Sequence, residues 1–276
     1  MKQYLAIIAM DIKLALRLRA VIFFNYLFPL IFFFTFATVL RGNSGDMAFV
    51  VTMSVTLGVL GSGFFGAGIR AIQERELGIL RRYKVTPITP APLLVGSMVT
   101  GWIIFIPYIV LLLLMAHFIY AMALPVHFFQ LLVFISLGLI AFRALGLVIA
   151  SVANTMQEGT ILVQLFYFPM LLLSGATFPS EKFPRVMQII HNFVPATYLV
   201  QGMKNIMLKG QSLAEKENLL AVFVMLLTIL GGGLISAKLF RWEKEEKIRG
   251  SAKLWVLAVL APFFAMGIWK WFHTLR

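Results

Sequence analysis

The chain has 276 residues, of which 61% are hydrophobic and only 13% are charged, and its mean hydropathy is +0.92. Soluble domains are closer to half apolar and carry about twice this charged fraction, so the composition excludes an ordinary soluble protein. The net charge of +13 does not indicate nucleic-acid binding, because apolar runs separate the basic patches. The chain contains no cysteine, which excludes disulfides and cysteine metal sites.

Residues 1–19 form an amphipathic segment. Lys2, Lys13 and Arg17 fall on one narrow stripe of a helix whose remaining circumference is mostly apolar. This pattern is typical of a helix that lies in the membrane surface. We therefore expect an interfacial helix that leads into the first membrane span; the alternative is a frayed basic terminus.

Six apolar runs are long enough to cross a membrane. A hydrocarbon core of ~30 Å requires about 20 apolar residues in a helix. The sequence therefore predicts an all-α polytopic membrane protein with six transmembrane helices. The runs are Ala20–Leu40, Met47–Ile69, Leu93–Tyr120, Val126–Ala153, Thr160–Thr177 and Leu219–Ala237.

The distribution of basic residues predicts the orientation of these spans. Residues 1–19, 70–92 and 238–253 hold four, five and six Lys and Arg, whereas the links after the first and third spans hold one between them. Cytoplasmic loops carry the excess of Lys and Arg in membrane proteins. We therefore expect a cytoplasmic N-terminus, together with contacts between the basic patches and anionic membrane lipids.

Small residues in the second run predict close helix packing. Ser54, Gly58, Ser62 and Gly66 recur every four residues and would form a ridge that lets another helix approach. Residues 61–66 also match the GxGxxG pattern, but that motif requires a preceding strand, so packing is the better interpretation. A packing role, or that of a bend, is also open to Gly146, Ala150 and Gly231 to Gly233.

A polar island of 23 residues, Arg70–Pro92, separates the second and third runs. We predict a helix over Gln73–Lys84, which the prolines that follow would end before the third span. Gly78 inside such a helix would cost ~1 kcal/mol relative to alanine. Opposite charges at the two ends of this helix would complement its dipole: Glu74 and Glu76 in the first turn, and Arg81, Arg82 and Lys84 in the last.

Residues 178–218 are too apolar for a free loop and are interrupted by Pro179, Pro184 and Pro195. We expect this segment on the outer side, as two short re-entrant helices shielded by the rest of the protein. The tail, 241–276, is expected to be a charged linker followed by an additional hydrophobic helix. The run Leu254–Trp269 has Trp near both ends, which is typical of a crossing helix. A seventh span and a re-entrant or surface helix are both open.

No enzyme constellation is present in the sequence. The four histidines lack metal-ligand spacing, and no GxxxxGK[ST] phosphate loop occurs, so we expect no enzymatic activity and no metal or other cofactor in this chain. Arg143 lies well inside the fourth run without a carboxylate in any span. Either it anchors the structure, by snorkelling to the headgroups or otherwise, or it contacts an anionic lipid or substrate.

Two motifs in this sequence resemble those of type-2 ABC exporter permeases, most closely the daunorubicin-type antibiotic-resistance branch. The first is the run from Glu74 to Arg82 followed by Val85-Thr86-Pro87. The second comprises Leu173-Ser174-Gly175, Phe178-Pro179 and Pro195-Ala196-Thr197-Tyr198. The resemblance covers residues 1 to about 240, which we take as one transmembrane domain.

This resemblance implies a prokaryotic cell-membrane permease that works as a homodimer or heterodimer. Each copy would dock on a separately encoded ATP-binding subunit, which would hold the ATP and Mg. The predicted cargo is a hydrophobic or amphipathic drug or lipid; export of a lipid-linked glycan and a non-transporting scaffold or sensor are alternatives. The residues expected to couple to the ATP-binding subunit are Glu74, Arg75, Glu76, Gly78, Arg81, Arg82 and Lys84.

The same resemblance places a substrate path along the first, second and fifth spans. Polar side chains within spans either line such a path or form hydrogen bonds between helices. The candidates are Asn25, Gln164, Tyr167 and Ser174.

Overall fold

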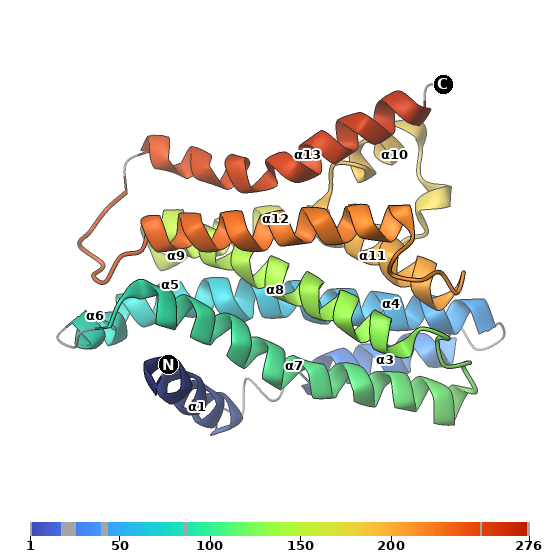
Figure 1. The fold of residues 1–276 in the computed structure, drawn as a ribbon, viewed down its shortest axis with the longest axis horizontal. Helices are drawn as coiled ribbons and strands as arrows, with labels where there is room; N and C mark the ends of the chain where they lie inside the picture. The colour runs from blue at the N-terminus through green and yellow to red at the C-terminus, as the bar shows by residue number, and fades with distance from the viewer. Residues whose placement is uncertain (1, 18–25, 40–43, 85–87, 249, 275–276) are drawn as a thin grey trace.

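The computed structural model describes residues 2–17, 26–39, 44–84, 88–248 and 250–274, and these residues form helices and connecting segments without a strand (Figure 1). The α-helices up to the middle of the chain are α1 (Lys2–Arg17), α3 (Phe28–Val39), α4 (Ser44–Gly61), α5 (Arg70–Glu76), α6 (Ile79–Lys84), α7 (Pro90–Tyr120) and α8 (Phe128–Val152). Those that follow are α9 (Met156–Leu173), α10 (Arg185–His191), α11 (Pro195–Met207), α12 (Lys216–Lys238) and α13 (Trp255–Thr274). A π-helix, η2 (Ser62–Ile69), joins α4 to α5, and the short 3-10 turns are η3 (Ser180–Lys182) and η4 (Gly250–Leu254).

Five of the described helices are long and apolar enough to cross a membrane. They are the continuous helix Met47–Glu76 together with α7, α8, α9 and α12, and they coincide with five of the six predicted runs. The apolar helix α3 covers part of the first run, whose residues 20–25 and 40 lie outside the described residues. The prediction of an all-α polytopic membrane protein is confirmed.

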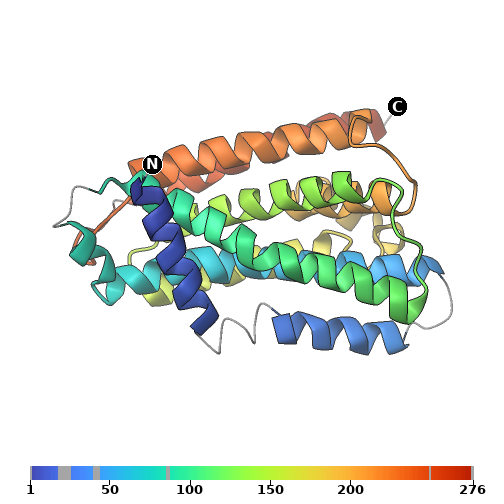
Figure 2. The same ribbon diagram turned by 60° about the horizontal axis from the view of Figure 1, so that its bottom comes forward.

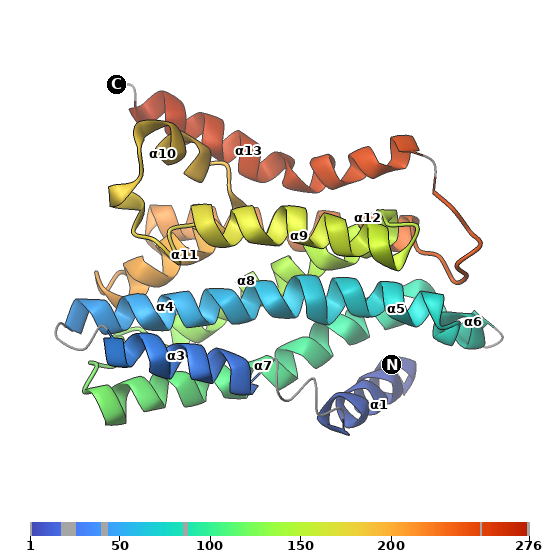
Figure 3. The same cartoon turned by 180° about the vertical axis from the view of Figure 1, so that it is seen from behind.

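The long helices run along one axis of the molecule, and α8 is the central one (Figures 1 and 3). Every residue from Ala141 to Val152 is buried, because η2, α7 and α12 all pack against α8. This helix is therefore the element through which the other spans contact one another.

The closest helix contact joins η2 to α8 through glycines. A Cβ atom on Gly146 would lie 2.0 Å from the carbonyl oxygen of Gly63, and one on Gly68 would lie 2.9 Å from the carbonyl oxygen of Gly146. Within the predicted ridge, Gly58 faces the ring of Phe105 on α7. The small residues thus bring two backbones into direct contact at the centre of the bundle.

The glycines of α12 differ from one another in their surroundings. A Cβ atom on Gly232 would lie 3.0 Å from the Cβ atom of Ala144, whereas Cβ atoms on Gly231 and Gly233 would have no neighbour within 4 Å. Only the middle glycine therefore lies in the contact with α8.

The bundle has two distinct ends (Figure 1). One, called here the α6 end, carries α1, α6 and the segment 239–248, and the other, called the α10 end, carries α10 and the last residues of α13. Helix α1 crosses the bundle obliquely at the α6 end (Figure 2) and packs on α7, where the Ile7 side chain sits against Gly96. The described residues of the three basic patches therefore gather at the α6 end.

The tail forms the long helix α13, which runs beside α12 from the α6 end to the α10 end (Figures 1 and 3). Pro262 lies inside this helix, and its apolar part is Trp255–Trp271. Helix α13 is not among the five helices long and apolar enough to cross a membrane, so a seventh span and a re-entrant or surface helix both stay predictions.

The segment 178–218 contains two short helices, α10 and α11, which residues 192–194 separate. Helix α11 packs against α4 and α8, and the side chains of Leu199 and Met203 are fully buried. Helix α10 remains on the outside of the bundle, where Val186 is exposed.

Candidate functional site

The polar island does not form one helix. Helix α5 ends at Glu76 and α6 begins at Ile79, and Gly78 between them has φ of +69°. The predicted single helix over Gln73–Lys84 is therefore wrong. Glycine has no Cβ atom and adopts this left-handed conformation freely, so Gly78 ends α5 instead of weakening an unbroken helix.

Helix α5 is the last part of a continuous helical rod, residues 44–76, formed by α4, η2 and α5. The backbone remains right-handed helical at both joints, Gly61 and Arg70. Glu74 and Glu76 therefore lie in the final turn of this rod and not in the first turn of a separate helix. The predicted match between these two carboxylates and a helix dipole is wrong for the same reason.

Arg70 connects the rod to the amphipathic helix α1. Its Nη2 atom lies 2.9 Å from Oδ1 of Asp11, and its Nε atom lies 2.7 Å from Oε1 of Glu74. The hydroxyl of Tyr83 on α6 also donates to the sulfur of Met10 at 3.7 Å. Helix α1 is thus held to both parts of the polar island.

Two arginines hold the C-terminal end of α8. Arg75 is 4% exposed and donates to the carbonyl oxygens of Ala150 and Ala153 at 2.9 and 2.6 Å. Arg241 approaches from the segment after α12 and donates to Ser151 and Ala153. The last carbonyls of a helix lack partners within the helix and carry partial negative charge, so two guanidinium groups stabilise this end.

Glu76 completes this junction from the same rod. Its Oε1 atom accepts a hydrogen bond from the backbone N–H of Met156 at 2.5 Å, at the start of α9. The N-terminal N–H groups of a helix favour a carboxylate. The end of the rod therefore contacts α8 through Arg75 and α9 through Glu76.

Helix α6 presents its basic residues to the surface. Arg81, Arg82 and Lys84 are exposed, while Leu80 is buried and anchors the helix. Arg81 and Arg82 thus form an exposed cationic face at the α6 end. Of the other predicted coupling residues, Glu76 is also exposed, Glu74 and Gly78 are half-buried, and Arg75 is buried.

The segment after α12 reaches α6 through Lys84. Its Nζ atom lies 3.0 Å from Oε1 of Glu243 and 3.6 Å from Oε1 of Glu246. The hydrogen bond from Lys84 lowers the pKa of the Glu243 carboxyl. The residues 241–246 therefore contact both α6 and the end of α8.

Arg143 is buried at the crossing of η2, α7 and α8, with 3% of its surface exposed. Its Nη1 atom donates to the carbonyl oxygen and the hydroxyl of Ser62 at 3.0 and 2.8 Å. Its Nη2 atom donates to the carbonyl oxygen and hydroxyl of Ser97 at 2.6 and 3.1 Å, and Nε donates to the same carbonyl at 3.1 Å. The side chain anchors three helices and does not snorkel to a surface.

Two glycines leave room for this arginine. A Cβ atom on Gly101 would lie 2.1 Å from Cζ of Arg143, and one on Gly66 would lie 3.4 Å from its Nη1 atom. Ser62 and Gly66 of the predicted small-residue ridge thus pack against a cation. Buried charges require such hydrogen bonding, because no water is present to replace it.

The candidate path residues do not come together. Gln164 is exposed on α9, Tyr167 packs edge-on against the rings of Phe64 and Phe65, and Ser174 lies at the α10 end. Asn25 lies outside the described residues. Their role in a substrate path stays a prediction.

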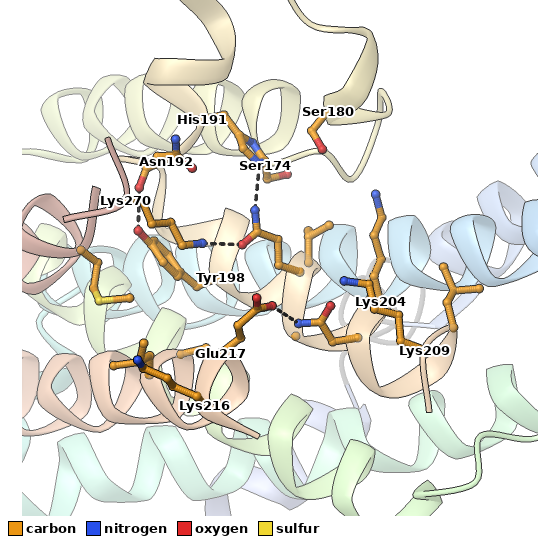
Figure 4. A pocket seen from close by; sticks show the side chains of 18 of the residues that line it. Ser174, Ser180, His191, Asn192, Tyr198, Lys204, Lys209, Lys216, Glu217 and Lys270 are labelled. Atoms are coloured by element: carbon orange, nitrogen blue, oxygen red, sulfur yellow. Dashed lines mark hydrogen bonds between the residues drawn. The ribbon is translucent and has the colours of Figure 1, made fainter. Parts of the chain in front are cut away.

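A cavity of about 680 Å³ lies at the α10 end, between α10, α11 and the adjacent parts of α12 and α13 (Figure 4). A chain of hydrogen bonds crosses it: Lys270 donates to Oε1 of Gln201 at 2.7 Å, and Nε2 of Gln201 lies 3.2 Å from Nε2 of His191. Nδ1 of His191 lies 2.6 Å from the carbonyl oxygen of Leu173, which can only accept. His191 therefore carries its proton on Nδ1 and accepts at Nε2.

This arrangement predicts a pH-dependent stability. Burial lowers the pKa of His191 below its usual value. The hydrogen bond to the Leu173 carbonyl and the charge of Glu181 oppose this shift, while the charges of Lys270 and Lys204 add to it. In the unfolded chain this histidine binds a proton at pH ~6.5, whereas in the folded chain it binds the proton only at a lower pH. The neutral histidine therefore contributes to the free energy of unfolding above that pH, and this contribution is lost as the pH falls. The midpoint of thermal unfolding in detergent should decrease from pH 7.5 to 5.5, and His191→Gln should reduce that decrease. An equal decrease in the two proteins would contradict this role of His191.

Several of these residues could not be identified from the sequence. Arg241 is one of six basic residues in 238–253, and nothing in that patch distinguishes it from its neighbours. Arg143 stood out as an intramembrane charge, but its partners Ser62 and Ser97 lie 81 and 46 positions away along the chain. The signal in the sequence was a charge well inside an apolar run, and it identified Arg143 alone.

The family model described as ABC-2 type transporter matches residues 2–208. Inner membrane transport permease YhhJ of Escherichia coli (strain K12) is 27% identical over 178 residues, which cover 64% of this chain and 46% of that protein. Transport permease YvfS of Bacillus subtilis (strain 168) is 24% identical over 226 residues, or 80% of this chain and 91% of that protein. A probable multidrug ABC transporter permease, YbhR of Escherichia coli (strain K12), is 29% identical over 59% of this chain and 44% of its own length.

The match to YhhJ spans less than half of that relative's length. Within this chain, the matched residues 2–208 include α1, the rod, α6 and the helices from α7 to α11. A family model that covers most of the chain, on an all-α fold with five helices able to span a membrane, settles the family. The protein belongs to the ABC-2 type transporter family and is a multi-pass membrane permease of the ABC transporter class.

Proposed function

We propose that this chain is the permease subunit of an ATP-driven exporter that moves hydrophobic or amphipathic compounds out of a prokaryotic cytoplasm. ATP and Mg²⁺ would be bound by a separately encoded ATP-binding subunit, and two permease copies, identical or different, would form the transport unit. In this arrangement α1 and α6 face the cytoplasm. The exposed cationic face of Arg81 and Arg82 carries the proposal.

The contacts behind α6 support a mechanical role for this face. Leu80 anchors α6, and Lys84 attaches it to Glu243. The adjoining rod bonds to α8 through Arg75 and to α9 through Glu76. A displacement of α6 by a docked subunit would therefore reach two spans across a turn of only two residues, Leu77 and Gly78. Such a displacement is a means of switching the access of a central path between the two sides of the membrane.

A charge-reversal experiment tests this proposal. The tagged full chain is purified from membranes with its partner, and the capture of an ATP-binding subunit is measured by mass spectrometry and by Mg-ATP hydrolysis. Exchanging Arg81 and Arg82 for Glu should reduce capture about tenfold or more. The exchange replaces attraction between the two subunits by repulsion, which costs several kcal/mol of binding free energy. The unfolding midpoint should stay unchanged.

The matched control makes the same change of charge at the opposite end. Lys182 and Arg185 are exposed at the α10 end, and their exchange for Glu should leave capture intact. Undiminished binding in the Arg81/Arg82 variant would show that α6 is not the docking element. Failure of the wild-type chain to capture any ATPase would support a scaffold or sensor instead.

A further inference from the structure

The cavity at the α10 end carries more positive than negative side chains. Its lining includes four lysines and two glutamates, and one of the glutamates, Glu217, already accepts a hydrogen bond from Asn205 at 3.2 Å. In Figure 4 Lys270 and Tyr198 lie at one end of the cavity, and Lys204 and Lys209 lie at the other. No group of three or more His, Asp and Glu that could hold a metal ion occurs among the described residues, so the cavity offers no cation site of that kind.

Lys204 is the informative side chain. It is half-buried on α11, and its Nζ atom donates to the carbonyl oxygen of Gly175 at 3.3 Å and lies 5.6 Å from the centre of the Phe49 ring. None of the ion pairs found among the described residues includes Lys204. Burial lowers its pKa, and the charge of Glu181 offsets this only in part. An ammonium group has three N–H donors, so this one retains donors for a further acceptor.

Lys270 is held toward the same cavity by a neutral chain. Gln201 accepts from Lys270 with its oxygen and so must turn its NH₂ group to His191, which accepts at Nε2. The ammonium of Lys270 also lies 4.8 Å from the centre of the Tyr198 ring. Its position is therefore fixed by an amide and an aromatic face, and this fixed cation lines the cavity together with Lys204.

An apolar surface adjoins these cations. Leu220, Ala221, Met266 and Trp269 line the same cavity. A cavity that combines positioned ammonium groups with an apolar wall suits a molecule with one anionic group and one apolar part. A charge-assisted hydrogen bond to phosphate or carboxylate would satisfy the remaining donors of Lys204.

We propose that this cavity is a binding site for the anionic group, a phosphate or carboxylate, of an amphipathic molecule, with Lys204 as its direct cationic contact and Lys270, at the other end of the cavity, as a second positive charge. The chemistry is shared by an anionic lipid headgroup and by free phosphate. The inference does not rest on the proposed exporter function, because it concerns the end of the bundle opposite α6 and requires neither ATP nor a partner.

Calorimetric titration of the full chain in phosphatidylcholine nanodiscs tests the site. The probes are short-chain phosphatidylglycerol, phosphatidylcholine of the same chain length, and inorganic phosphate, all at pH 7.5. Phosphatidylglycerol should bind at least about tenfold more tightly than phosphatidylcholine. Lys204→Gln should remove most of that difference, and Lys270→Gln should remove a smaller part of it. Lys204→Arg keeps the cation and should restore binding, which separates loss of charge from loss of fold.

The control variant is Lys182→Gln, which removes an exposed charge of the same outer segment outside the cavity lining and should bind like the wild type. If inorganic phosphate competes with phosphatidylglycerol, the site exists and also accepts a free anion. If phosphatidylglycerol binds and phosphate does not compete with it, the site exists and its ligand is a lipid. Equal binding of the two lipids without binding of phosphate, absence of binding by every probe, or an equal effect of Lys204→Gln and Lys182→Gln would overturn the proposal.

Discussion

Replacing Arg143 with leucine is expected to lower the free energy of unfolding by about 3 kcal/mol or more, which would leave little folded protein in the membrane. The substitution removes the donors to two backbone carbonyls, of Ser62 and Ser97, and to their hydroxyls. It also leaves a void, because leucine does not reach the space that Gly66 and Gly101 leave for the guanidinium. At this depth no water replaces the lost hydrogen bonds.

Two further variants separate charge from geometry in this prediction. Arg143→Lys keeps the cation but cannot donate to Ser62 and Ser97 with a planar fork, so we expect an intermediate loss of stability. Gly101→Ala leaves the arginine in place but forces it to move, because the new methyl would lie 2.1 Å from Cζ. Thermal unfolding in detergent, followed by circular dichroism, measures all three. Wild-type stability of Arg143→Leu would show that the hydrogen bonds at this crossing contribute nothing.

Substitution of Gly146 by valine is expected to separate η2 from α8. The added Cβ atom would lie 2.0 Å from the carbonyl oxygen of Gly63 and 3.2 Å from the backbone nitrogen of Gly68. Since backbone atoms cannot move alone, the two helices must part along their length. Overpacking of this kind costs about 1–3 kcal/mol when side chains can yield, and we expect more where only backbones meet.

A glycine without neighbours provides the matched control for Gly146. A Cβ atom on Gly233 meets nothing within 4 Å, and this residue lies inside the helix α12. Gly233→Ala should raise the unfolding midpoint slightly, because alanine is favoured over glycine in a helix by ~1 kcal/mol. The two substitutions should therefore change stability in opposite directions. A loss of equal size at both positions would contradict the glycine contact between η2 and α8.

The transmembrane helices could be predicted from the sequence because each depends on a local property. Runs such as Leu93–Tyr120 and Leu219–Ala237 are recognisable by their length and apolarity alone, and α7 and α12 cover them. The break at Gly78 was not predicted, although the residue was noted, because its energetic cost in a helix does not reveal which conformation the chain adopts instead.

The candidate site depends on contacts between distant segments, and the sequence gives little information on these. The charge of Arg75 suggested a surface role within the polar island, yet its partners are backbone carbonyls of α8, 75 and 78 positions away. Every residue has a backbone carbonyl, so the sequence does not indicate which carbonyl accepts a hydrogen bond from a given side chain. By contrast, Arg81 and Arg82 are charged residues of a short helix, α6, that buries Leu80. Their exposure depends on this local pattern, and it agrees with the predicted surface role.

The segment that carries Arg241, Glu243 and Glu246 has a practical consequence for shortened versions of this protein. The family match ends at residue 208, and a chain cut at residue 240 would retain the five helices of the described residues that are long and apolar enough to cross a membrane. Such a cut would nevertheless remove half of the cation pair at the end of α8 and both ion-pair partners of Lys84. The segment 241–274 is therefore better kept intact than cut at the end of the last predicted span, because the cut would also remove α13 and Lys270.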